Sequence, residues 1–148
     1  MLNLAECSRD FFLVILGAII ALLADFILRY LDSRSKQKHN ASILLYDLKS
    51  IESYFTNPKL KNEIHITNLR YTENWQTIIA ECSFLSSEHI MLLYSVYDNV
   101  YDYNYLYNMN HNASNQWLTE TNNSSNVIRS IIKNDKWHSI IDYLEKKV

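Results

Sequence analysis

The sequence predicts an all-α fold, with one N-terminal transmembrane helix followed by a cytoplasmic bundle of about four helices. The first observation behind this prediction is an apolar run over residues 11–31. The second is the helical spacing of the apolar residues downstream of that run. The third is that the 148 residues include one glycine and one proline. Because Gly17 lies inside the apolar run, the rest of the chain lacks the residue that hairpin turns and phosphate-binding loops use.

Residues 11–31 have the length and composition of a membrane span. The run is unbroken from Phe11 to Ala24. A helix over 11–31 covers roughly 31 Å at about 1.5 Å per residue, which matches the core of a bilayer. The residues before the run lack the basic character of a signal peptide, so we expect an uncleaved anchor. We therefore predict a membrane anchor over residues 1–31 and a cytoplasmic helical bundle over residues 32–148.

The charges that flank the run predict its orientation. Arg9 stands alone upstream, whereas four basic residues follow within or just after the end of the run. The positive-inside rule then predicts a single-pass protein of the inner (plasma) membrane, with the N-terminus outside and the C-terminal domain in the cytoplasm. We expect the four residues to form a basic collar that contacts membrane lipid headgroups. The collar consists of Arg29, Arg34, Lys36 and Lys38.

Small and polar residues of the run share one helix face. Gly17, Ala21 and Asp25 fall at positions i, i+4 and i+8. Small residues at this spacing let helix backbones approach closely, and a polar residue on the same face can hydrogen-bond across the contact. We therefore expect a homo-oligomer whose protomers pack, or line a pore, through this face. In the alternative interpretation, Asp25 reaches headgroup water and pairs with Arg29, and the small residues have no special role.

The next helix is predicted from apolar residues that recur every three or four positions before Asn57-Pro58 ends the element. No glycine or proline lies between Gly17 and this end, so the sequence leaves open whether residues 11–56 form one continuous helix. The apolar positions are Ile43, Leu44, Leu48, Ile51 and Phe55.

A further short helix is predicted after residue 72. Thr72 is its expected N-cap, and the apolar stripe that follows has helical spacing. The stripe consists of Trp75, Ile78, Ile79, Cys82 and Leu85.

Three more segments complete the bundle. Ser86-Ser87-Glu88 opens a helix that we expect to end at about Asn108. Residues 110–126 are rich in asparagine and serine, so we expect a loop there, with Trp117-Leu118 packing back on the domain. The last helix spans about residues 125–147, and Asn134-Asp135 is a candidate break that would divide it into two.

The helix over residues 86–108 carries most of the eleven tyrosines. We expect most tyrosine rings to lie in the core with their hydroxyl groups at its rim. The alternative is a protein-contact face, because tyrosine is enriched at the residues that dominate interface energetics. The candidate partner surface consists of Tyr94, Tyr97, Tyr101 and Tyr105.

The charge distribution argues against a nucleic-acid partner. No lysine or arginine lies between Arg70 and Arg129, although that stretch contains several carboxylates. A phosphate backbone is repelled by such a surface, and aromatic stacking platforms for bases come interleaved with basic residues. We therefore expect no nucleic-acid partner.

Motifs that carry chemistry are nearly absent. The Cys7 and Cys82 thiols have no metal-ligand spacing and are expected to be inert, and we expect no enzymatic activity, no metal and no cofactor. One short pattern has a mechanism: Arg34 and His39 fit the R-x4-H pattern of HEPN ribonucleases. In that pattern, arginine stabilises phosphate charge and histidine transfers protons. The competing interpretation is that these residues belong to the basic collar.

The layout as a whole resembles a known group of proteins. An N-terminal anchor and a basic collar precede a glycine-free bundle with a W-x6-C-x2-L pattern (Trp75, Cys82, Leu85) and the tyrosine-rich segment YSVYDNVYDYNYLY. This layout resembles small bacterial membrane-anchored helical-bundle proteins, among them the HEPN-like membrane accessory proteins of RNA-targeting CRISPR systems, which assemble into membrane pores. The resemblance implies an oligomeric membrane effector in antiviral defence.

Three functional hypotheses follow from these observations. The first is a single-pass membrane protein that oligomerises and perturbs or permeabilises the membrane. The second is a membrane-tethered adaptor that recruits a protein partner through its acidic, tyrosine-rich surface. The third is a HEPN-like ribonuclease.

Overall fold

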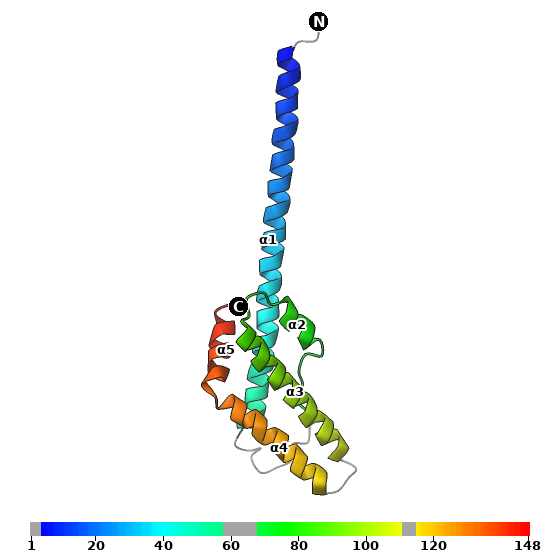
Figure 1. Cartoon of the computed structure of the whole chain (residues 1–148), viewed down its shortest axis with the longest axis vertical. Coiled ribbons are helices and arrows are strands. Elements are labelled where there is room, and N and C mark those ends of the chain that lie inside the picture. The colour runs from blue at the N-terminus through cyan, green and yellow to red at the C-terminus, as the bar shows by residue number, and fades with distance from the viewer. Residues whose placement is uncertain (1–3, 58–67, 111–114) are drawn as a thin grey trace. The chain divides into compact units, whose positions relative to one another are not determined.

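The computed structural model of the chain describes residues 4–57, 68–110 and 115–148 (Figure 1). These ranges contain α-helices and no strand, so the all-α prediction is confirmed. The chain divides into two compact units, Met1–Lys36 and Gln37–Val148. The helices are α1 (Leu4–Thr56), α2 (Trp75–Glu81), α3 (Ser87–Asn110), α4 (Asn115–Ile132) and α5 (Asp135–Glu145).

Helix α1 is a single element that contributes to both units. It continues without a break because no glycine or proline interrupts it after Gly17, and it ends at Thr56, as the Asn57-Pro58 pair predicts. The predicted domain boundary after residue 31 falls inside this helix, and the two units meet between Lys36 and Gln37. The second part of α1 is therefore a helix of the bundle.

The second unit has one hydrophobic core, to which α1 contributes a stripe. The buried residues of α1 recur every three or four positions, and a helix with that spacing presents all of them on one face. Their burial confirms the predicted stripe over this segment, although Ile43 is only partly buried. The buried apolar residues of α1 are Ala41, Leu44, Leu48, Ile51 and Phe55.

Helices α2 to α5 cover this stripe with aromatic and branched side chains. The Trp75 and Tyr97 rings are stacked, with centroids 4.7 Å apart and planes 5° from parallel. Trp137 of α5 is fully buried in the same core. Large, close-packed rings of this kind carry much of the burial energy of a small domain. Other core residues of these helices are Ile79, Leu93, Val100, Ile128, Ile140 and Leu144.

The prediction that Thr72 caps the next helix is wrong. Helix α2 begins at Trp75, and Asn74 holds the N-cap position without a side-chain cap. The Thr72 N–H group instead donates to Asp47 Oδ2 at 3.0 Å, because a buried carboxylate of α1 binds the segment there. The predicted stripe also outlasts the helix: α2 ends at Glu81, while Cys82 and Leu85 are buried beyond its end.

The start of α3 is confirmed. The Ser86 hydroxyl accepts a hydrogen bond from the His89 N–H group at 3.2 Å, and the helix continues to Asn110. Such a cap satisfies a backbone donor that has no partner within the helix.

The expected loop over residues 110–126 is wrong from residue 115 onward, where α4 begins. The asparagine- and serine-rich composition is a poor helix former, but Thr121, Ile128 and Ile132 are buried at spacings of seven and four. Packing of this face against the neighbouring α3 overrides local propensity. The predicted packing of Trp117-Leu118 lies outside the residues whose side chains the structure describes.

The predicted break in the last helix is confirmed. Helix α4 ends at Ile132 and α5 begins at Asp135. The Asn134 side chain caps α5 by accepting a hydrogen bond from the Lys136 N–H group at 3.0 Å. An asparagine at the N-cap stabilises the start of a helix, which explains the break at this position.

Candidate functional site

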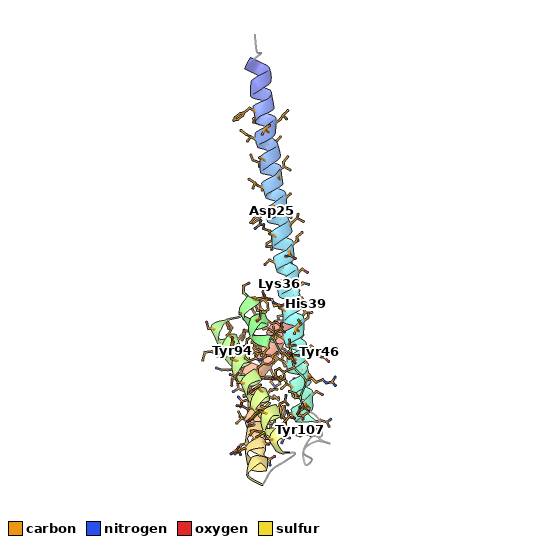
Figure 2. The ribbon with its side chains drawn as sticks, turned by 90° about the vertical axis from the view of Figure 1, so that its right-hand side faces the viewer. Asp25, Lys36, His39, Tyr46, Tyr94 and Tyr107 are labelled. Atoms are coloured by element: carbon orange, nitrogen blue, oxygen red, sulfur yellow. The ribbon has the colours of Figure 1, made fainter. Side chains whose placement is uncertain are left out.

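The apolar part of α1 is the most prominent candidate site. Every residue from 11 to 36 is exposed, and the large apolar side chains of residues 11–31 are between 42% and 70% exposed. Figure 2 shows these side chains projecting from both sides of the helix. By length and composition, this helix is long and apolar enough to cross a membrane. Soluble proteins rarely expose a contiguous apolar surface this extensive, so the segment requires an apolar environment.

The two charges inside residues 11–31 form an ion pair. Arg29 Nε lies 2.8 Å from Asp25 Oδ2, one turn away on the same helix, and both side chains are exposed. The pairing proposed from the sequence is therefore confirmed. An ion pair within one helix lowers the cost of transferring either charge into a low-dielectric environment.

The small residues of the predicted packing face have open space beside them. A Cβ atom added to Gly17 would meet no other atom within 4 Å, and Ala21 is exposed. Glycine in a helix interior costs about 1 kcal/mol relative to alanine. Within the described residues, no side chain packs against Gly17.

The residues of the predicted basic collar fall in both units. Arg29, Arg34 and Lys36 are exposed in the first unit. Lys38 belongs to the second unit, where its Nζ donates to the carbonyl oxygen of Val148 at 2.9 Å. Lys38 is thus held by the end of the chain.

The two residues of the R-x4-H pattern also fall in different units. Arg34 is exposed in the first unit, and His39 is exposed in the second. His39 lines a cavity of about 550 Å³ together with Asp47 and Arg70. The ribonuclease hypothesis stays a prediction: if it holds, Arg34→Ala and His39→Ala each abolish RNA cleavage by the purified protein.

The tyrosines of α3 divide between core and surface. Tyr94, Tyr101 and Tyr105 are exposed, and the Tyr94 ring packs edge-on against Trp75 at 4.9 Å between centroids. Tyr97 is fully buried, so its assignment to the partner surface is wrong. The Tyr97 ring is covered by Trp75, a contact that spacing along α3 does not reveal. The exposed set of three tyrosines is called the α3 tyrosine surface below.

A buried carboxylate that the sequence analysis missed fixes the interior of the bundle. Asp47 is 3% exposed, and its Oδ2 accepts hydrogen bonds from the Tyr97 hydroxyl at 2.9 Å and from the Thr72 N–H group at 3.0 Å. Burial and the nearby carboxylate raise the pKa of Tyr97, which keeps its phenol protonated. The sequence feature that indicates its burial is its spacing: Asp47 lies three residues after Leu44 and four before Ile51, on the buried stripe. Its contacts join α1 to α3 and to the segment that precedes α2.

Candidates for other chemistry are few. Burial raises the pKa of the Cys82 thiol to about 11, so it is protonated and unreactive at neutral pH. Among the described residues, no three histidine, cysteine, aspartate or glutamate side chains are grouped so that they could hold a metal ion.

Comparisons with protein-family models, curated proteins and solved structures find no match to this chain. The resemblance to HEPN-like membrane accessory proteins therefore stays a prediction. The fold and the site define the chain as an all-helical protein with an N-terminal helix long and apolar enough to span a membrane.

Proposed function

We propose that this chain is a single-pass membrane protein that self-associates through its membrane helix and thereby perturbs the bilayer. One observation carries the proposal: the apolar side chains of residues 11–31 are exposed on all sides of α1. Burying apolar area releases roughly 25 cal/mol per Å². A bilayer offers an apolar environment around the entire circumference of such a helix, which a single protein partner does not.

The charges near the end of the span support one orientation. Arg29, Arg34 and Lys36 are exposed after the apolar run. By the positive-inside rule this end faces the cytoplasm, and the unit Gln37–Val148 is the cytoplasmic domain.

The open face around Gly17 supports self-association. Small residues at Gly17 and Ala21 let a second helix approach, and the missing Cβ leaves space that no described residue fills. The Asp25 carboxylate, already paired with Arg29, lies one turn further along this face. In an oligomer these pairs would line a polar interior, which provides a route for ions and small solutes across the bilayer.

Oligomer sizing and dye leakage test this proposal together. We expect wild-type protein to form a defined oligomer in mild detergent and to release dye from liposomes. Gly17→Leu fills the space at the helix contact, so it should shift the protein toward monomer and reduce leakage at least several-fold. Ile19→Phe adds bulk on the opposite side of the helix and serves as the matched control, with little expected effect.

Two results would contradict the proposal. One is a wild-type protein that is strictly monomeric in detergent and in bilayers. The other is undiminished leakage when Gly17→Leu is combined with Asp25→Leu, because that variant removes both the close approach and the carboxylate.

The α3 tyrosine surface supports a second candidate function, a membrane-tethered adaptor. Tyr94, Tyr101 and Tyr105 are exposed on one helix, and exposed tyrosines are typical of protein-contact surfaces. An unrelated membrane helix in place of residues 11–31 separates the two functions. If the chain is an adaptor, it still binds its partner after this exchange and loses the partner with Tyr101→Ser and Tyr105→Ser. If the chain acts by self-association, the exchange alone abolishes dye leakage.

A further inference from the structure

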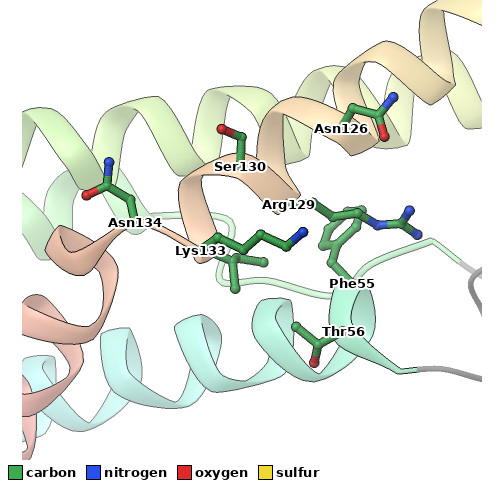
Figure 3. A pocket seen from close by; sticks show the side chains of 8 residues that line it. Phe55, Thr56, Asn126, Arg129, Ser130, Lys133 and Asn134 are labelled. Atoms are coloured by element: carbon green, nitrogen blue, oxygen red, sulfur yellow. The ribbon is translucent and has the colours of Figure 1, made fainter.

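A cavity of about 760 Å³ lies in the second unit, between the C-terminal end of α1 and helix α4. Figure 3 shows the Arg129 and Lys133 side chains extending from α4 into the space that faces α1. The two residues are one helical turn apart, so their cationic groups share one face. The residues of the cavity used below are Phe55, Thr56, Asn126, Arg129, Ser130 and Lys133.

Among the described residues, no carboxylate neutralises the positive charge of this cavity. Within the described residues, neither Arg129 nor Lys133 forms an ion pair, and the cavity lining contains no carboxylate. The Arg129 Nε atom is buried and has no hydrogen-bond acceptor in the described part of the chain. Buried donors are nearly always satisfied, so an unsatisfied guanidinium donor beside a cavity points to an acceptor that the described residues do not supply.

We propose that this cavity binds a phosphate-bearing small molecule. Guanidinium and ammonium groups together match a phosphate dianion in charge and in hydrogen-bond geometry. The Ser130 hydroxyl and the Asn126 amide supply neutral donors, whereas the Thr56 hydroxyl already donates to the Glu52 carbonyl oxygen at 2.7 Å. The Phe55 ring supplies an apolar wall for an organic body. The cavity volume falls in the range that holds ligands of drug size, so it accommodates more than an inorganic ion.

The same chemistry recognises a soluble phosphate ester or the headgroup of a phospholipid. A polynucleotide does not fit the surroundings, because the sequence has no lysine or arginine between Arg70 and Arg129 that could follow a phosphate backbone. The site lies wholly within Gln37–Val148 and does not depend on the proposed membrane function.

Calorimetric titration of the full-length protein in a neutral detergent tests the proposal. ATP and glycerol 3-phosphate serve as probes of a large and a small phosphate compound. We expect saturable binding of at least one probe. Arg129→Gln and Lys133→Gln each remove a charge-assisted hydrogen bond, so each should weaken binding at least about tenfold. Lys49→Gln removes one positive charge from an exposed position elsewhere in the unit and should change affinity less than about twofold.

Two outcomes overturn the proposal: no saturable binding of either probe to wild type, or equal affinity in Lys133→Gln and Lys49→Gln. Lys133 is exposed, so its substitution leaves the fold intact even if Arg129→Gln does not fold. Far-UV circular dichroism identifies a folding defect. Loss of probe binding with retained oligomer formation and dye leakage would refute this site while leaving the proposed membrane function standing.

Nanodiscs distinguish the two sources of phosphate. Wild-type protein is placed in three kinds of disc and titrated with whichever probe binds in detergent. The discs contain phosphatidylcholine alone, phosphatidylcholine with phosphatidic acid, or phosphatidylcholine with oleate. Oleate supplies the same negative charge as phosphatidic acid but carries no phosphate. Weaker probe binding with phosphatidic acid alone supports a lipid headgroup in the cavity. Equal probe binding in all three supports a soluble phosphate compound.

Discussion

The two parts of α1 differ in how their apolar residues are arranged around the helix. Over residues 11–31 apolar side chains occupy every side, and all of them are exposed. Over residues 41–55 the buried positions form one stripe, from Ala41 to Phe55, while Tyr46 between them is 75% exposed. A stripe requires one protein neighbour, whereas a helix that is apolar all round requires an apolar environment on every side. One continuous helix thus combines two different arrangements of apolar residues.

The polar residues differ between the two regions in the same way. In the second unit, Asp47 accepts hydrogen bonds from Thr72 and Tyr97, residues distant in the sequence. In the first unit, the Asp25 side chain pairs with Arg29, one turn away on the same helix. Polar groups of a folded domain are satisfied by other elements of that domain. A helix surrounded by lipid has to satisfy them within itself or with other helices of the bilayer.

The largest expected effect comes from placing charge on the apolar segment. Ile15→Arg combined with Ile19→Arg should raise the free energy of membrane insertion by about 5–7 kcal/mol, because each arginine near the centre of a span costs about 2.5–3.5 kcal/mol. Carbonate extraction of membranes measures the result: wild-type protein stays with the membrane and the double variant does not. Tyr46→Arg, in the second part of α1, serves as the control and should stay with the membrane. A double variant that resists extraction would contradict a bilayer environment for residues 11–31.

The next largest effect is expected on the free energy of unfolding, when one leucine from each part of α1 is replaced by alanine. Leu48 is fully buried, so Leu48→Ala removes packed atoms and leaves a cavity, which should lower the free energy of unfolding by about 2–5 kcal/mol. Leu22 is 70% exposed, so Leu22→Ala should leave the unfolding of the second unit unchanged. Tryptophan fluorescence during urea unfolding in neutral detergent measures both. Equal destabilisation by the two substitutions would mean that residues around Leu22 pack in the folded domain.

The fold could be predicted from sequence where burial depends on periodicity alone. The stripe from Leu44 to Phe55 and the break at Asn134-Asp135 were predictable, because helical spacing and capping chemistry are local. The helix over residues 115–126 was not, because its asparagines and serines favour a loop and the helix depends on packing in the bundle, chiefly against α3. Local propensity is a weak term, and tertiary contacts override it.

Features of the candidate sites were likewise predictable where they depend on neighbouring residues, and not where they depend on residues distant in the sequence. The Asp25–Arg29 pair follows from i, i+4 spacing on one helix, so the sequence was sufficient for it. The burial of Tyr97 depends on Trp75 and Asp47, which are distant in the sequence. The cavity beside Arg129 depends on the meeting of α1 and α4, and no local pattern encodes that meeting.

A smaller effect is expected from the buried hydrogen bond between Tyr97 and Asp47. Tyr97→Phe removes the hydroxyl that donates to Asp47 Oδ2 and leaves the buried carboxylate with one donor fewer. The free energy of unfolding should fall by about 1–3 kcal/mol. Urea unfolding at neutral pH measures this change. A neutral result would mean that water replaces the lost donor and that Asp47 is less enclosed than its 3% exposure indicates.

The same variant changes the dependence of stability on alkaline pH. Burial raises the pKa of Tyr97 in the folded protein, whereas an unperturbed tyrosine has a pKa of about 10. Above about pH 10 the unfolded chain has therefore lost a proton that the folded chain keeps, so stability is fully present below that pH and falls as pH rises. Tyr97→Phe should make this fall less steep. Thermal unfolding between pH 8 and 11 measures the slopes of the two proteins.

The smallest effect is expected from an exposed ion pair of the second unit. Lys49 Nζ lies 2.6 Å from Glu145 Oε1, and the side chains are 53% and 47% exposed. Glu145→Gln should lower the free energy of unfolding by no more than about 1 kcal/mol, and the difference should vanish near 1 M salt, because water and ions screen such pairs. Urea unfolding at low and high salt measures it.

The Arg29–Asp25 ion pair of the apolar segment can be compared with the Lys49–Glu145 pair of the second unit. Both of its side chains are exposed, yet a bilayer would shield them from salt. Arg29→Gln should leave the unfolding of the second unit unchanged and should reduce the share of protein that resists carbonate extraction, at low and at high salt alike. High salt is expected to remove the effect of Glu145→Gln. If it also removes the effect of Arg29→Gln, the two ion pairs share an aqueous environment. In that case Asp25 lies at the surface of the membrane and cannot lie within the helix contact.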